Sequence, residues 1–363
     1  MMELIINAVS VRRSPQDKHI SYLGSLFLGD IARLIDDNRL YVPNQPELPD
    51  FAQRKLNKVR VKQIAVYILE NYQTGMIFFP PICVNVQPKP RYEEGKLFLP
   101  YHSVSLRLTD GQHRCFGIYQ VLKEIQEKDS IKFKHLSQLE IGVLLYSGLS
   151  LEEERQAFRD QNLLVQRPSI SLSHYFDQRS PAVLMAKNLL ETVPQFIDNI
   201  EMIETGLGHY NPKLMTLSTL VTTTKYMFPS LKSQENLEAK INWARSFWIA
   251  SANIFDNNPW RVMTKEERSQ QRQETLLVSA VFLQALGLLA HDLYQEDVPA
   301  EQLEKWLKNL KKLDWRRDNK FWLERGVIQI GATEEPIISN TKTTVKACHK
   351  VLREFVGIME IMV

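Results

Sequence analysis

The chain has 363 residues, of which 44% are hydrophobic and 24% are charged. These proportions are typical of globular proteins and argue against disordered, collagenous and coiled-coil classes. The formal net charge of +3 is too small to identify a polyanionic partner. At about 150 residues per domain, the length predicts roughly two domains.

Cysteine usage and hydropathy indicate the compartment. Cys83, Cys115 and Cys348 are far apart and form no Cys-x-x-Cys motif, so neither a disulfide framework nor a zinc ribbon is predicted. The first residues lack a basic region followed by an apolar run, which argues against a secretory signal. Residues 276–290 are the most apolar later stretch, but about 15 residues are fewer than the roughly 18–20 of a membrane span. We expect a protein of a reducing compartment that does not associate with membranes.

Strand-like and helix-like segments alternate over residues 1–149. A strand is predicted first, followed by an amphipathic helix and a loop broken by Pro43, Pro46 and Pro49. A second helix has apolar residues at i, i+3, i+4 and i+7. The predicted strands span residues 4–11, 77–86 and 141–146, and residues 97–108 could supply further strands. The predicted helices span residues 22–37, 58–71 and 112–126.

From residue 150 onward nearly every segment has helical spacing. Ser150 and Glu153 have the Ser-x-x-Glu form of a capping box, which marks the start of a helix. The predicted helices here span residues 151–164, 182–192, 212–227, 235–254, 274–293, 300–313 and 343–355. A short strand is predicted near 327–331. The sequence therefore predicts an α/β (α+β) protein with an α/β domain over 1–149 and a mainly α-helical domain over 150–363.

The feature with the most specific chemistry is Asp110-Gly111-Gln112-His113-Arg114, between an apolar strand and a helix. A glycine allows a tight turn, and the first N–H groups of the next helix form a ready anion site. Arg114 adds a planar set of donors and His113 a titratable one. Asp110 could orient Arg114, cap the helix or hold Mg²⁺. An ordinary turn with solvated charges has the same spacing.

This pentapeptide resembles the signature of the DGQHR-domain proteins. Within that group the chain is most similar to the DndB family, encoded with DNA phosphorothioate (sulfur) modification systems. Further similar segments are residues 77–81, 158–162 with Pro168, 213–218, Asp314-Trp315 and Trp322. The resemblance implies a ParB/sulfiredoxin-like amino-terminal domain, and it assigns Gly111, His113 and Arg114 to phosphate contact.

A second candidate segment follows the pentapeptide. Phe158 and Asn162 are four residues apart on one helical face, and they resemble the Phe-x-x-x-Asn segment of the family. Asn162 could contact a ligand or the Asp110 turn, or it could simply end a helix. The candidate phosphate- or nucleotide-binding residues are Asp110, Gly111, Gln112, His113, Arg114 and Asn162.

Two segments are candidates for DNA binding. The first segment carries five cations with no acidic residue between them, namely Arg54, Lys55, Lys58, Arg60 and Lys62. They could attract DNA phosphates or form a solvated face. The glycine-containing loop 206–213, with Lys213, and the hydroxyl-rich helix after it could donate to phosphates or lie half-buried. A third basic set, over 305–320, fits the solvated face of an amphipathic helix.

The resemblance implies a DNA-binding regulator that represses its modification operon in the bacterial cytoplasm. The partners it implies are double-stranded DNA and other proteins of the modification system, and a homo-oligomer is compatible. The alternative is an enzyme, an Mg²⁺-dependent nucleoside triphosphatase that binds ATP or another NTP. His113 and Arg114 would then contact the phosphates, Asp110 the Mg²⁺ and Asn162 the ribose or base. No other catalytic motif is present, and Cys115 is predicted to be a buried structural thiol.

Overall fold

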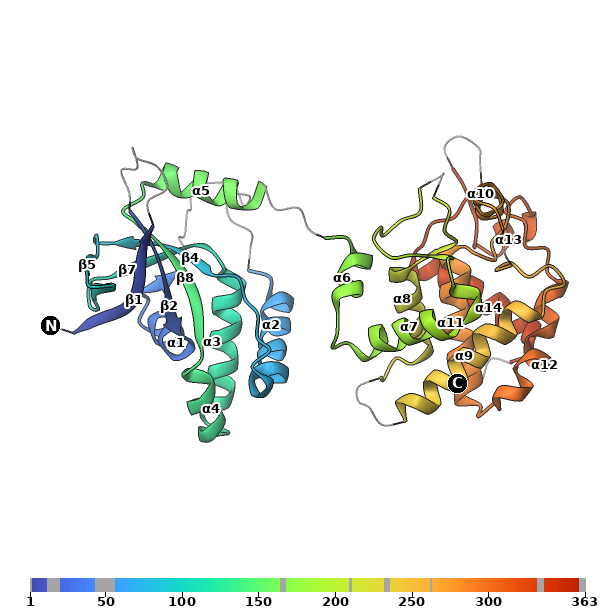
Figure 1. Ribbon diagram of the computed structural model, residues 1–363, viewed down its shortest axis with the longest axis horizontal. Helices are drawn as coiled ribbons and strands as arrows, with labels where there is room; N and C mark the ends of the chain where they lie inside the picture. Colours follow the sequence, from blue (N-terminus) through green and yellow to red (C-terminus); the bar gives the residue numbers. More distant parts are fainter. Residues whose placement is uncertain are drawn as a thin grey trace. The chain divides into compact units, whose positions relative to one another are not determined.

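The computed structural model describes residues 2–11, 20–42, 56–163, 168–208, 211–231, 236–261, 263–331 and 336–358. It separates into two compact units, Met1–Gln166 and Arg167–Val363, coloured blue to green and green to red in Figure 1. The first unit carries the large sheet and the second is almost entirely helical. The predicted α/β class is therefore confirmed.

The described part of the first unit is built on an eight-stranded sheet in the order β3-β7-β4-β8-β2-β1-β6-β5. The sheet is mixed, because β4 is parallel to β8 and antiparallel to β7. Its strands are β1 (Glu3–Val11), β2 (Ser21–Phe27), β3 (Leu40–Tyr41), β4 (Ile82–Gln87), β5 (Arg91–Glu93), β6 (Lys96–Pro100), β7 (Ser105–Asp110) and β8 (Glu140–Ser147). The strand predicted over 4–11 corresponds to β1.

Helices pack together on one face of this sheet. They are α1 (Leu28–Asp36), α2 (Lys58–Asn71), α3 (Gln112–Gln126) and α4 (Ser130–Ser137). The helices α2 and α3 approach closely at Gly117, where a Cβ would lie 2.6 Å from Cγ2 of Ile64. The bounds of α2 and α3 agree with the predicted helices, since apolar spacing marks both.

The helix α5 (Leu151–Leu163) contacts β7 instead and is drawn apart from α1–α4 in Figure 1. Leu106 and Leu108 of β7 belong to the core beneath α1–α4. Because successive strand side chains point to opposite faces, Arg107 projects the other way and meets Glu154 of α5. These contacts place α5 in the first unit, so the boundary between the two units comes after this helix in the chain.

The helix predicted over residues 22–37 is wrong in its first half, where the structure has β2. This strand pairs with β1 on one side and β8 on the other. Tyr22 and Leu26 are buried while Leu23 and Phe27 are exposed, a pattern that fits either period over so few residues. Gly24 permits the close pairing, because a Cβ there would lie 2.5 Å from the carbonyl oxygen of Asn7. Pairing between strands distant in sequence thus overrode the local helical spacing.

The second unit is a helical assembly around α11, which contacts α8 and α14. Its helices are α6 (Ile170–Phe176), α7 (Pro181–Thr192), α8 (Leu217–Met227), α9 (Leu237–Asn253), α10 (Lys265–Glu274), α11 (Ala280–Gln295), α12 (Leu303–Leu307), α13 (Lys320–Glu324) and α14 (Lys342–Val356). Its short strands are β9 (Ile200–Glu201), β10 (Met215–Thr216), β11 (Gln329–Ile330) and β12 (Pro336–Ile337). The strand expected near 327–331 is β11. Over the ranges that the structure describes, no helix is both long and apolar enough to span a bilayer.

Candidate functional site

The turn between β7 and α3 has the backbone geometry that its sequence predicts. Gly111 occupies the position before the helix with φ of 96°, in the left-handed region that favours glycine. Space excludes a side chain as well, because a Cβ would lie 2.8 Å from Cγ2 of Ile82 and 3.0 Å from Nη2 of Arg114. Two independent constraints therefore require glycine at this position.

Arg114 folds back over this turn. Its Nη2 donates to Oδ2 of Asp110 at 2.8 Å and to the carbonyl of Pro81 at 3.3 Å. The Arg114 side chain is 14% exposed, against 43% for Asp110. Of the three roles considered for Asp110, the structure shows the first, orientation of Arg114. The pair ties the start of α3 to the end of β7.

His113 joins the amino termini of two helices. Its Nε2 accepts a hydrogen bond of 3.0 Å from the backbone N–H of Asn57. Asn57 is the residue before α2, and its side chain accepts from Val59 N and Arg60 N. Since Gly117 of α3 packs against α2 one turn further along, the two helices begin at the same edge. Their positive dipole ends therefore lie side by side.

Three predicted DNA-binding cations lie in the first two turns of α2. Lys58, Arg60 and Lys62 of α2 are exposed, and the first turn of α2 has no acidic residue. Arg54 and Lys55 lie outside the described residues. We define the basic edge as Asn57, Lys58, Arg60, Lys62 and His113.

The predicted second segment reaches the neighbourhood of the turn through a residue that sequence reasoning missed. Gln161 of α5 donates through Nε2 to the hydroxyl of Tyr146 at 2.6 Å and lies near the Cys83 thiol. Burial and the nearby Asp110 carboxylate raise the pKa of Cys83 to about 11, so the thiol is protonated at neutral pH. Asn162 is in the last turn of α5, but its side chain lies outside the described residues. Ala157 and Gln161 are four residues apart and so lie on one face of α5, and Ala157 packs against the sheet. This spacing is the sequence signal that could have identified Gln161.

A buried polar cluster seats α5 on the sheet. Oε1 of Glu154 lies 2.7 Å from Nη2 of Arg107 and accepts from Nδ2 of Asn85. Asn85 also bonds both backbone groups of Leu149, donating to O at 2.9 Å and accepting from N at 3.0 Å. Burial makes each partner depend on the others, because a lost partner leaves an uncompensated charge or dipole.

The predicted start of α5 and the predicted structural thiol are both confirmed. Ser150 N donates to Glu153 Oε2 at 2.8 Å, and Glu153 N donates to Ser150 Oγ at 3.2 Å. This reciprocal pair is a capping box. Cys115 is fully buried, and burial raises its pKa to about 12. No described cysteine is in a disulfide.

In the second unit, Lys213 and the hydroxyl-rich helix make hydrogen bonds within the fold. Lys213 donates through Nζ to the carbonyl of Asp198 at 2.8 Å. Thr222, Thr223 and Thr224 of α8 donate to the carbonyls four residues earlier. Thr223 and Thr224 are fully buried, so much of the hydroxyl-rich helix is buried, while DNA binding by Lys213 stays a prediction.

No group of three or more His, Cys, Asp or Glu side chains suited to a metal ion occurs within the ranges that the structure describes. The carboxylate of Asp110, the candidate Mg²⁺ ligand, is paired with Arg114. The described residues at this turn bring together the guanidinium of Arg114, the carboxylate of Asp110 and the amino termini of α2 and α3.

The fold and the turn together define a two-unit protein, in which an α/β unit presents an Asp-Gly strand-to-helix turn and a helical unit follows. The family model for DndB, described as DNA-sulfur modification-associated, matches residues 9–359. The chain therefore belongs to the DndB family and is a component of a DNA-sulfur modification system. No curated protein and no solved structure matches the chain. The ParB-like relationship consequently remains a prediction, and the nucleoside triphosphatase alternative gains no support.

Proposed function

We propose that this protein binds double-stranded DNA and regulates the sulfur-modification system to which it belongs, with the basic edge as its contact to DNA phosphates. The observation that carries the proposal is the hydrogen bond from Asn57 N to His113 Nε2. This bond brings the amino termini of two helices together, and Lys58, Arg60 and Lys62 are exposed in the first two turns of α2.

The electrostatics of this edge favour an anion from several directions. Each helix amino terminus carries roughly half a positive charge, and Lys58, Arg60 and Lys62 add full charges nearby. The first turn of α2 contains no acid that would offset them. A duplex carries one negative charge per roughly 1.7 Å of its axis, so several such cations can each neutralise a phosphate.

Within this proposal Asp110 and Arg114 are positioning residues. Their ion pair of 2.8 Å, together with the Pro81 contact, holds the first turn of α3 in place. The same placement sets the position of His113, because His113 is also in the first turn of α3. Phosphate contacts position a protein on DNA without reading its sequence, so preference for a promoter is a separate, measurable property.

Removing the three exposed charges is the direct test. We expect the triple variant Lys58→Gln, Arg60→Gln, Lys62→Gln to lower the slope of log affinity against log salt by up to about three, one per lost phosphate contact. Affinity at about 0.15 M salt should fall by at least roughly tenfold. The measurement is fluorescence anisotropy with a labelled duplex from the promoter of the modification operon and an unrelated duplex of equal length.

The matched control removes the same charge elsewhere. Lys305, Lys308 and Lys312 are exposed in the second unit, and changing all three to Gln should leave the salt slope unchanged. Equal losses in the two triple variants would mean that only net charge matters and would reject the basic edge. Equal affinity of the wild-type protein for the two duplexes would contradict a regulatory role.

A further inference from the structure

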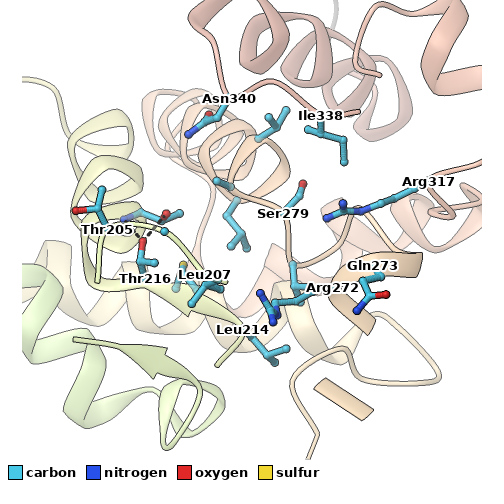
Figure 2. Close-up of a pocket in the computed structure, with 17 residues that line it drawn as sticks. Thr205, Leu207, Leu214, Thr216, Arg272, Gln273, Ser279, Arg317, Ile338 and Asn340 are labelled. Atoms are coloured by element: carbon cyan, nitrogen blue, oxygen red, sulfur yellow. Dashed lines mark hydrogen bonds between the residues drawn. The ribbon is translucent and has the colours of Figure 1, made fainter. Parts of the chain in front are cut away.

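A pocket of about 470 Å³ lies in the second unit, and it shares no residue with the basic edge. Its walls come from the segment around residues 205–207, the starts of α8 and α11, the end of α10, and Arg317, Ile338 and Asn340. Figure 2 shows these side chains around one cavity. The volume lies within the roughly 300–1,000 Å³ that is usual for small-molecule sites.

Two arginines give this pocket its charge. Figure 2 shows Arg317 extending toward Ser279 and Arg272 extending toward Leu207. Among the described residues that line the pocket, none is an Asp or Glu. The described lining therefore brings two positive charges to the cavity without a carboxylate of its own.

Backbone carbonyls hold both guanidinium groups in place. Arg272 donates through Nη2 to the carbonyls of Gly208 at 3.0 Å and Asn211 at 2.7 Å. Arg317 donates through Nε to the carbonyl of Thr275 at 3.2 Å. Backbone carbonyls orient a guanidinium without neutralising its charge.

The proximity of these charges has an electrostatic cost. Burial lowers the pKa of Arg272 below its usual range. Burial, together with the nearby charge of Arg272, lowers the pKa of Arg317 as well. An anion between the two groups would offset both the lost hydration and the repulsion. Thr216 and Ser279, the residues that precede α8 and the 16-residue α11, line the pocket. The amino termini of these helices therefore add positive potential to the cavity.

The remaining lining is suited to an organic molecule. Leu207, Leu214, Val278 and Ile338 form apolar wall, and hydroxyls and an amide lie beside it on Thr205, Thr219 and Asn340. A bare ion would leave that wall unused. A ligand with an anionic end and an apolar or planar body would contact both parts of the cavity.

We propose that this cavity, the arginine pocket, binds a phosphate-bearing small molecule of about mononucleotide size, with the phosphate between Arg272 and Arg317 and the organic part against the apolar wall. A guanidinium pair suits a phosphate because its planar donors match the phosphate oxygens. The proposal is independent of DNA binding at the basic edge, since the two sites have no residue in common.

Calorimetric titration of the full chain tests this proposal. The probes are the four common nucleoside monophosphates, the corresponding nucleosides and inorganic phosphate. We expect at least one monophosphate to bind, and its nucleoside to bind at least roughly tenfold more weakly because charged hydrogen bonds are lost. Absence of binding by all four monophosphates up to millimolar concentration would overturn the proposal, as would equal affinity for nucleoside and monophosphate.

Substitutions locate the binding. Arg317→Gln should weaken the monophosphate by about 10–100-fold, and Arg317→Lys should recover part of that loss because it keeps the charge without the planar fork. Arg316→Gln is the matched control, since its side chain is exposed and pairs with Asp314 at 2.7 Å. If Arg317→Gln does not fold, as its melting curve without ligand would show, Arg317→Lys alone must still bind more weakly than wild type. Unchanged affinity in the Arg317 variants would place the ligand elsewhere and overturn the proposal.

Discussion

Replacing Glu154 by alanine is expected to lower the free energy of unfolding of the first unit by about 3–5 kcal/mol, the cost of removing one partner of a buried ion pair. The change leaves the Arg107 guanidinium, whose side chain is 20% exposed, without its carboxylate. It also removes one of the two acceptors of Asn85 Nδ2, leaving the carbonyl of Leu149 as the other. Because this cluster seats α5, we expect α5 to detach before the rest of the sheet unfolds.

Two measurements follow this change. Urea unfolding monitored by far-ultraviolet circular dichroism should shift to lower urea, and Cys83 should react faster with a thiol reagent, because it packs beneath Ala157 of α5. The control is Glu152→Ala, which removes an exposed carboxylate from the same helical turn. Equal thiol reactivity in Glu154→Ala and wild type would show that the cluster does not hold α5.

Replacing Gly287 by valine is expected to destabilise the second unit by about 1–3 kcal/mol through overpacking. A Cβ at this position would lie 2.7 Å from the carbonyl oxygen and 2.8 Å from Cγ2 of Thr223. The nearest atom belongs to the backbone of α8, which cannot rotate away as a side chain would. The helices α8 and α11 would therefore have to separate.

All six tryptophans lie in the second unit, so their fluorescence follows the unfolding of that unit. Gly287→Val should lower Tm by this probe by roughly 2–4 °C per kcal/mol. Gly208→Ala is the control, because a Cβ there meets nothing within 4 Å. A Tm for Gly287→Val equal to that of wild type would contradict the close packing of α8 on α11. Glu154→Ala should leave the tryptophan transition unchanged, which separates the two units.

Local signals predicted much of the first unit. The bounds of α2 and α3 follow from apolar spacing over 14 and 15 residues, long enough for the helical period to be unambiguous. Gly111 was identifiable because an Asp-Gly pair between a strand and a helix indicates a turn. The start of α5 was identifiable because Ser150 and Glu153 cap within a single turn. Short elements such as β2 and α4 lack that length, and neighbouring strands or helices decided them.

For the candidate sites, the same difference between local and long-range contacts separates what the sequence predicts from what the tertiary structure decides. By itself the sequence determined the presence of a glycine turn, the helix that follows it and a run of cations on α2, because each depends on residues within about one turn of one another. Only the tertiary structure decided that Arg114 turns back onto Asp110, that His113 meets Asn57, and that Arg272 and Arg317 share a cavity. Those contacts join segments distant along the chain or choose between side-chain directions, and packing of the whole unit sets both.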